Sequence, residues 1–272
     1  MPKPFNRINM KLLLLITSLW ISGRPSKPLP ALHYFYNSGW MIETSKHAIL
    51  IDFIPHQASG STFDRVKQML QQAAARNKKI LVMVTHDHQD HFDPAVLQLH
   101  NDVPGITYIL GWNYQAATGT SIHTLLPGDS LIQPAYNVYT HTSTDEGVGF
   151  LLEIDGLSIY HAGDHALWAE QILQLFTDEL KAIRGKTKQI DLAFIPAARG
   201  MFTKCAYDSV IGKGIQLSLD ILQPTAIALQ HVGCEEKLST YQQAYMNLNL
   251  PKDRRVWVLP SRYNQAFPSK AN

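Results

Sequence analysis

The residues most capable of chemistry lie in one ten-residue stretch, Thr85-His86-Asp87-His88-Gln89-Asp90-His91-Phe92-Asp93-Pro94. It holds three histidines and three carboxylates. His86 and His88 are two positions apart, so in an extended chain their imidazoles project to the same side and can bind one metal ion. Asp90 and His91 follow a change of direction and can bind a second ion. The stretch therefore predicts a metal site with two positions.

The flanking sequence explains how this stretch would be positioned. The apolar run at residues 80–84 predicts a buried strand that ends at the first histidine. Asp93 is a preferred helix N-cap, and Pro94 fits the first helical position because no amide hydrogen is needed there. We therefore expect a ligand loop held between a strand and a short helix at about residues 94–100.

Three further candidates each follow a predicted strand: His141 after residues 136–140, Asp164 after 157–161, and His231 after 225–230. Taken singly, each has a structural explanation, since a histidine at a strand end is commonly hydrogen-bonded and Gly-Asp commonly forms a turn. Sheet-based enzymes place their chemistry where strand ends converge, however. We expect the three side chains to meet the first cluster there.

The pattern His-x-His-x-Asp-His, followed by these three residues, resembles the signature of the metallo-β-lactamase superfamily, and most closely its ascorbate-phosphate lactonase-like group. Residues 148–150, 160–164 and 193–196 match the superfamily as well, and the resemblance covers about residues 31–260. It implies an α/β fold, the four-layer αββα sandwich of two mixed sheets flanked by helices.

By the same resemblance, His86, His88 and His141 would hold one metal, Asp90, His91 and His231 the other, and Asp164 would bridge the two. Zinc is favoured, while manganese or iron also accept such nitrogen and oxygen ligands. Two ions can share a hydroxide, because metal binding lowers the pKa of water from about 15.7 to about 7. This hydroxide would attack an ester, lactone or phosphoester, with Asp90 moving the proton.

Other polar residues are assigned supporting roles. We expect Asp87 and Gln89 to orient the imidazoles. His165 could reach the cleft, and Arg199 lies in a loop that would suit an anionic substrate, although a solvated loop charge explains it equally well.

Two other function classes stay open: an iron-dependent redox enzyme of the same fold, and a metal-free binding protein. Metal analysis of protein purified without added zinc would discriminate the redox enzyme. Loss or retention of metal and activity on replacing His86 or Asp164 would discriminate the binding protein. A β-lactamase proper is disfavoured by Asp90 beside His91.

Composition limits the partners. The 272-residue chain is 45% hydrophobic and 17% charged, with a formal charge of +2, which indicates a globular protein with room for a large core. Without a long Lys/Arg run we expect a small-molecule substrate and no nucleic acid. Two cysteines, Cys205 and Cys234, allow one bridge or two free thiols.

The first thirty residues differ from the rest. Three basic residues precede the apolar block at residues 12–21, and small and proline-rich residues follow. Residues 1–30 therefore predict a secretory signal, or an uncleaved N-terminal anchor, ahead of a catalytic domain at 31–272. The protein would be periplasmic or secreted, with no stable membrane span if the segment is removed. A buried first helix or strand in a cytoplasmic protein is the competing interpretation.

The remaining pattern alternates strands and helices. We expect an opening meander over residues 32–53 and a helix from about 61 to 74. A hairpin is expected at Asp155-Gly156, helices over 168–183, 207–222 and 236–248, and a closing strand at 256–259.

Overall fold

A computed structural model describes residues 27–55, 60–115, 121–199, 208–240, 256–258 and 260–269. Most of the predicted signal or anchor segment, residues 1–26, lies outside this part of the chain. Leu29, close to the expected domain start, packs against the main hydrophobic core. In the described ranges, no helix is long and apolar enough to cross a membrane.

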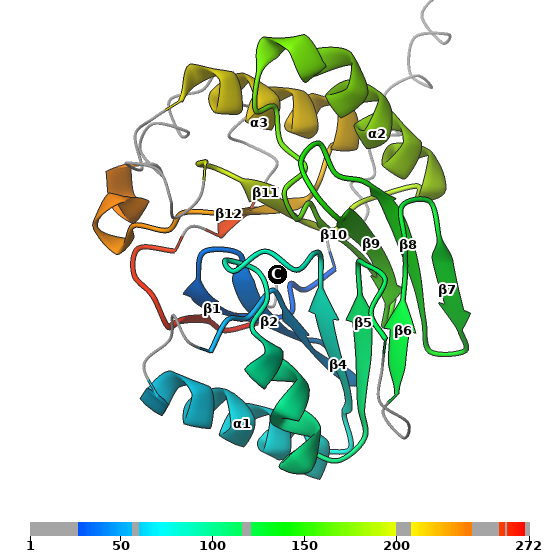
Figure 1. The fold of residues 1–272 in the computed structure, drawn as a ribbon, viewed down its shortest axis with the longest axis vertical. Coiled ribbons are helices and arrows are strands. Elements are labelled where there is room, and N and C mark those ends of the chain that lie inside the picture. Colours follow the sequence, from blue (N-terminus) through cyan, green and yellow to red (C-terminus); the bar gives the residue numbers. More distant parts are fainter. Residues whose placement is uncertain are drawn as a thin grey trace, which may run out of the picture.

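Two seven-stranded sheets form the centre of the molecule (Figure 1). The first has the order β14-β1-β2-β3-β4-β5-β6. Its strands are β1 (Ala31–Tyr36), β2 (Gly39–Glu43), β3 (His47–Ile51), β4 (Lys79–Val84), β5 (Ile106–Leu110), β6 (Ile122–Thr124) and β14 (Gln265–Phe267). Strands β1 to β3 pair antiparallel, as the predicted meander requires, and β3 to β6 pair parallel.

The second sheet has the order β13-β12-β11-β10-β9-β8-β7. Its strands are β7 (Ser130–Gln133), β8 (Tyr136–Thr142), β9 (Val148–Ile154), β10 (Leu157–His161), β11 (Leu192–Pro196), β12 (Ala226–Gln230) and β13 (Val256–Val258). Strands β7 to β10 pair antiparallel and β10 to β13 parallel. Each sheet is therefore mixed, as predicted.

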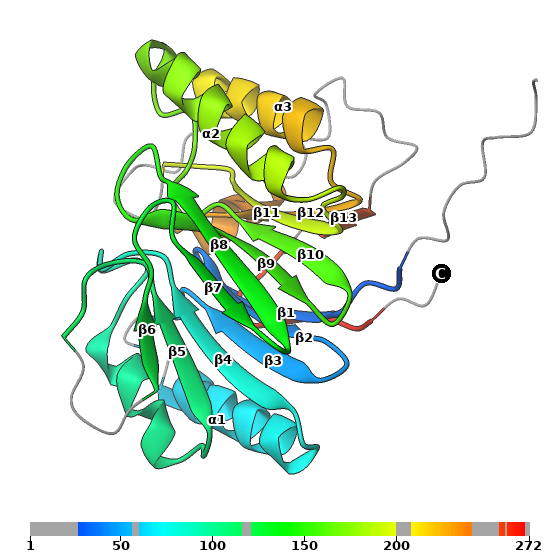
Figure 2. The same ribbon diagram turned by 90° about the vertical axis from the view of Figure 1, so that its right-hand side faces the viewer.

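Helices cover the outer faces of both sheets, and Figure 2 shows the resulting four layers. Helix α1 (Gly60–Ala75) covers the first sheet, and α2 (Leu173–Lys186) and α3 (Ser209–Leu222) cover the second. Short 3₁₀ helices are η1 (Pro94–Asn101), η2 (Glu170–Ile172) and η3 (Glu235–Lys237). The predicted αββα sandwich is confirmed.

The helices differ from expectation in two places. The segment after Pro94 is a 3₁₀ helix, and the helix expected from residue 168 begins at 173 after the short turn η2. The helix expected at 236–248 falls largely outside the described residues. Strand β14 carries no clear alternation and was not predicted.

Apolar spacing explains how the layers pack. On α1, Val66, Leu70 and Ala73 recur at three- and four-residue intervals and are fully buried against the first sheet. Strand β4 is apolar on both faces because it is covered by α1 on one side and by the other sheet on the other. Parallel strands of this kind present their carboxyl ends at one rim, which is where the candidate ligands lie.

Candidate metal centre

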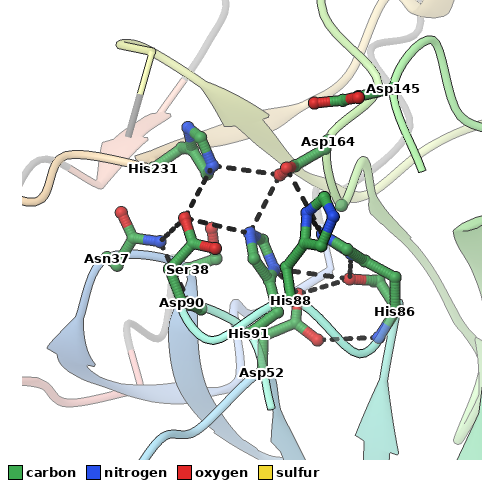
Figure 3. A network of polar contacts seen from close by, with 12 residues as sticks. Asn37, Ser38, Asp52, His86, His88, Asp90, His91, Asp145, Asp164 and His231 are labelled. Carbon is green, nitrogen blue, oxygen red and sulfur yellow. Dashed lines mark hydrogen bonds and ion pairs between the residues drawn. The ribbon is translucent and has the colours of Figure 1, made fainter. Parts of the chain in front are cut away.

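Asp164 stands at the centre of a buried cluster of imidazoles and carboxylates (Figure 3). Its Oδ1 lies 2.9 Å from His91 Nε2 and 3.0 Å from His231 Nε2, and its Oδ2 lies 3.4 Å from His86 Nε2. Asp90 Oδ2 lies 3.6 Å from His231 Nε2 and 3.8 Å from His91 Nε2. Two groups could therefore each hold an ion: His86, His91 and Asp164, and Asp90, His91 and His231.

The atoms that face one another here make no hydrogen bond of acceptable geometry. His91 Nε2, His231 Nε2 and Asp164 Oδ1 are all buried and have no hydrogen-bond partner among the residues that the structure describes. Buried polar atoms are normally satisfied, because an unmade hydrogen bond costs roughly 1–3 kcal/mol. Nitrogen and oxygen donors that converge without bonding one another suit a cation that ligates them, so the residues fit a metal site.

Asp52, at the end of β3, fixes the orientation of His91. Its Oδ2 accepts from His91 Nδ1 at 2.8 Å, and its two oxygens also accept from the backbone N–H and the hydroxyl of Thr85 at 2.8 Å each. The Nδ1–H tautomer that this contact selects leaves the Nε2 lone pair free to bind a metal. Asp52 is fully buried and has a left-handed backbone with φ 46°.

The turn between His88 and His91 directs the ligand loop back toward the cluster. The carbonyl of His88 accepts from the N–H groups of His91 at 2.9 Å and Phe92 at 2.8 Å. Asp93 then accepts from Ala95 N at 2.8 Å, which confirms the predicted N-cap. Asp90 and His91 are thereby buried while His88 is half-exposed.

Asn37, in the turn between β1 and β2, joins two ligand segments. Its Nδ2 donates to the Asp90 carbonyl at 3.2 Å and to Asp90 Oδ2 at 3.4 Å. Its own carbonyl accepts from His231 N at 3.0 Å. Asn37 is fully buried at φ 48°, a conformation that asparagine tolerates better than most residues. One residue of the first sheet therefore contacts ligand segments of both sheets, Asp90 through its side chain and His231 through its backbone carbonyl.

His231 and Asp164 reach the site through unusual backbone conformations. His231 has φ 65°, and its Nδ1 donates to the Ala198 carbonyl at 2.8 Å, which points Nε2 toward Asp164. Gly163 has φ 56°, and a Cβ there would lie 2.7 Å from the Val148 carbonyl oxygen. The Gly-Asp turn therefore requires glycine, because a side chain has no room.

The carboxylates and imidazoles shift one another's pKa values. Burial alone would raise the pKa of Asp164, but His231 and His91 hold it well below its usual range. Burial would lower the pKa of His91, but Asp164 and Asp52 raise it well above its usual range, and Asp164 in the same way raises the pKa of His231 to about 9. Without a metal the cluster is thus held together by ionised carboxylates and protonated imidazoles, and a bound cation would replace the protons.

Two of the predicted ligands are placed less centrally. His88 Nδ1 lies 3.1 Å from His86 Nε2, but its ring is 42% exposed and its Nε2 lies 3.3 Å from Glu146. His141, inside β8, belongs to neither candidate group. Its Nδ1 donates to the Thr142 carbonyl at 2.9 Å, and its Nε2 accepts from Tyr160 Oη at 3.1 Å. Because both ring nitrogens are engaged, His141 as a ligand stays a prediction.

Several supporting roles are corrected. Asp87 and Gln89 are exposed, and the imidazole-orienting contacts come from Asp52 and Thr85 instead. His165 does not line the cleft: it is buried against His141, with Nε2 donating to the Phe176 carbonyl at 3.1 Å. Arg199 does lie at the cleft, as expected.

Cys234 is disulfide-bonded. Cys205, the chain's other cysteine, falls outside the described residues.

A cleft of about 760 Å³ opens directly onto the cluster. Its lining includes both polar and apolar side chains. Its lining comprises His88, Gln89, Asp90, Thr144, Asp145, Asp164, Trp168, Ala169, Ile172, Arg199 and His231. The volume falls within the range typical of small-molecule sites.

Sequence reasoning assigned no role to Asn37 or Trp168, although both contact the ligand segments. Asn37 carried a turn signal, and its preference for positive φ was the only available hint. Trp168 lay inside an expected helix, so nothing in the pattern placed its indole beside His231.

Proteins similar to this chain are known. Residues 31–183 match the family described as "Beta-lactamase superfamily domain". A UPF0173 metal-dependent hydrolase of Pelotomaculum thermopropionicum is 28% identical over 178 residues, covering 59% of this chain and 68% of that protein. A similarly named protein of Bacillus velezensis is 26% identical over 183 residues, covering 60% and 71%.

Solved structures share the fold. Igni18, a metallo hydrolase from Ignicoccus hospitalis, has a TM-score of 0.56 at 17% identity, covering 88% of this chain and 97% of its own. CmlA, a diiron β-hydroxylase from Streptomyces venezuelae, has a TM-score of 0.53 at 12% identity, covering 90% and 55%. One architecture therefore carries more than one chemistry, and function must be argued from the site.

Proposed function

The chain belongs to the β-lactamase superfamily, and we propose that it is a hydrolase dependent on two divalent metal ions at the Asp164 cluster. The supporting observation is the convergence of three buried atoms, His91 Nε2, His231 Nε2 and Asp164 Oδ1. Asp164 Oδ1 lies 2.9 and 3.0 Å from the two nitrogens as an ion pair, yet none of the three makes a hydrogen bond of acceptable geometry within the described residues. Ligation accounts for their arrangement, and relatives named metal-dependent hydrolases share the family.

Asp164 would contact both ions, since its two oxygens face different imidazoles. His86 would hold the first ion, with His88 and, after leaving Tyr160, His141. Asp90, His91 and His231 would hold the second. Neutral imidazole and carboxylate suit zinc, and we propose zinc as the native metal.

Bound ions would supply Lewis acidity and lower the pKa of water toward neutrality. The chain's own groups then position the reactants. Burial would raise the pKa of Asp90, but His231 and His91 lower it, so the carboxylate is ionised and its Oδ2 can accept a proton from water in the cleft. We propose an ester, lactone or phosphoester as the bond cleaved.

Metal quantification of protein purified without added metal, together with assays on a lactone, a phosphodiester and a β-lactam, tests this function. We expect about two ions per chain and turnover of at least one non-lactam substrate. Asp164→Ala should lose both metal and activity. The matched control His123→Gln, on β6 and outside the cluster, should lose neither.

Two results would contradict the proposal. Retention of metal and turnover by Asp164→Ala would show that the cluster is not the active centre. Iron in place of zinc, with oxygen-dependent product formation, would favour the redox enzyme.

A further inference from the structure

We propose that Trp168, Ala169 and Ile172 form an apolar subsite that takes an aromatic or branched aliphatic group of the substrate beside the metal centre. This inference rests on the proposed hydrolase function and names its substrate class, a small ester or lactone with one bulky apolar substituent. The three residues line the cleft and are half-buried, so part of each is accessible to a ligand. Leu167, the apolar residue next to Trp168, is in contrast fully buried.

The indole of Trp168 is fixed relative to the metal ligands. Its Nε1 donates to the Asp164 carbonyl at 2.9 Å, and its ring centroid lies 5.5 Å from that of His231. With its one polar atom engaged, the indole presents an apolar face to the cleft. A ring stacked there would lie next to the bond presented to the Asp164 cluster.

Thr144 hydrogen-bonds to the backbone two residues before Trp168. The Thr144 hydroxyl donates to the Ala166 carbonyl at 2.7 Å and accepts from Ala166 N at 2.9 Å. The segment between Asp164 and Trp168 therefore has little freedom. A rigid apolar surface binds with less loss of conformational entropy than a mobile one.

Arg199 hydrogen-bonds to the same segment at the Trp168 carbonyl. Its Nη2 donates to the Trp168 carbonyl at 2.6 Å and its Nε donates to Asp208 Oδ2 at 2.6 Å. Asp208 is itself the N-cap of α3, accepting from Val210 N and Ile211 N. The guanidinium is thus engaged with a carboxylate and a carbonyl, and we assign it to supporting the Trp168 wall instead of binding an anion.

The rest of the lining suits the reacting end of the substrate, because it includes the polar residues His88, Gln89, Thr144 and the exposed Asp145. A substrate with an apolar substituent and polar atoms around the scissile bond matches a lining of both kinds. Removing an apolar contact of this kind typically changes kcat/KM by about 10–200-fold.

The first test compares methyl phenylacetate with methyl acetate by pH-stat, using the metal-loaded protein. We expect kcat/KM to favour the phenylacetate at least about tenfold. The preference should persist in Trp168→Phe and largely disappear in Trp168→Ala. Arg199→Lys keeps the charge but cannot hydrogen-bond to the Trp168 carbonyl and Asp208 at the same time, so it should weaken the preference. Lys213→Gln is the control: it removes an exposed cation paired with Glu170 and should leave the preference unchanged.

The second test needs no turnover. In protein labelled with 5-fluorotryptophan, the ¹⁹F resonance of Trp168 is assigned by its loss in Trp168→Phe. It should shift on titration with benzyl alcohol and not with glycerol.

The two readouts separate the two proposals. A shift without hydrolysis of any ester, lactone or phosphodiester supports the subsite and contradicts the hydrolase function. Hydrolysis with the same ester ratio in the wild type and Trp168→Ala, and no shift, overturns the subsite and leaves the hydrolase function standing. No shift and no hydrolysis overturns both.

Discussion

Replacing Asn37 by glycine should weaken the binding of one of the two proposed ions. Glycine adopts φ 48° at no steric cost, so the substitution removes the carboxamide and leaves the turn intact. Two contacts to Asp90 are lost, one to its carbonyl at 3.2 Å and one to its carboxylate at 3.4 Å. Both are long, so we take about 0.5 kcal/mol for the first and about 1.5 kcal/mol for the second, the lower ends of their ranges.

This sum of about 2 kcal/mol corresponds to a weakening of about 30-fold in the affinity of the position that contains Asp90. A chelator-competition titration of metal-free Asn37→Gly should therefore show one ion bound nearly as in the wild type and one bound about 30-fold more weakly. The free energy of unfolding of the metal-free variant in urea should fall by no more than about 2 kcal/mol.

Ser38→Ala is the matched control. Ser38 is the next residue in the same turn, and its buried hydroxyl has no hydrogen-bond partner in the described part of the chain, so its loss should leave both affinities unchanged. Wild-type affinity at both positions in Asn37→Gly would refute the reasoning, because Asp90 would then be held without Asn37. Equal weakening of both positions would show a general distortion of the site instead of a loss of positioning.

Asp52→Asn should lower metal affinity about 10–100-fold, measured by calorimetry, because the amide no longer fixes the His91 tautomer. Gly149→Ala should lower the free energy of unfolding by about 1–3 kcal/mol in urea, because the new Cβ would lie 2.0 Å from His141 Nε2; unchanged stability would show that this ring moves freely. Burial would lower the pKa of His231, but Asp164 raises it from its ordinary value of 6.5 to about 9. The metal-free protein should therefore be most stabilised by this group below pH 6.5 and lose that stability as the pH rises through about 9, visible as a falling Tm. A Tm that rises over this window would contradict the ion pairing with Asp164.

Many of the site residues could be predicted from the sequence because they follow apolar strands. His86, Asp164 and His231 each come directly after a run that alternates or is continuously apolar, so strand assignment alone placed them at one rim. The pairing of β10 with β11 and β11 with β12 then brings the last two together. Local pattern was sufficient here because parallel strands bring their ends to the same side.

The features of the site that the sequence did not predict depend on contacts between residues far apart in the chain. Asn37 meets Asp90 and His231 across 53 and 194 positions, and no local pattern encodes either contact. Trp168 sits outside a helix because η2 begins only at Glu170, a boundary that apolar spacing does not fix. The side chain of His141 can face Tyr160 or the other ligands, and only the packing of the full fold chooses between them.

Polar contacts join the two sheets at both ends, and those ends serve different purposes. At the far end, Asp155 in the β9–β10 turn accepts from Thr44 Oγ1 at 2.6 Å and lies 3.1 Å from His47 Nδ1. These contacts join the β2–β3 turn of one sheet to the β9–β10 turn of the other. At the metal end, Asn37, Asp52 and His231 all adopt left-handed backbones that cost of order 1–3 kcal/mol each. Such strain persists only where surrounding contacts over-determine it, and here each strained residue either carries a candidate ligand or hydrogen-bonds to one. Asp155 at the far end is left-handed as well, with φ 50°, but there the positive φ serves the Asp-Gly hairpin turn. At the metal end, by contrast, the three strained residues are ones that carry or orient donor atoms.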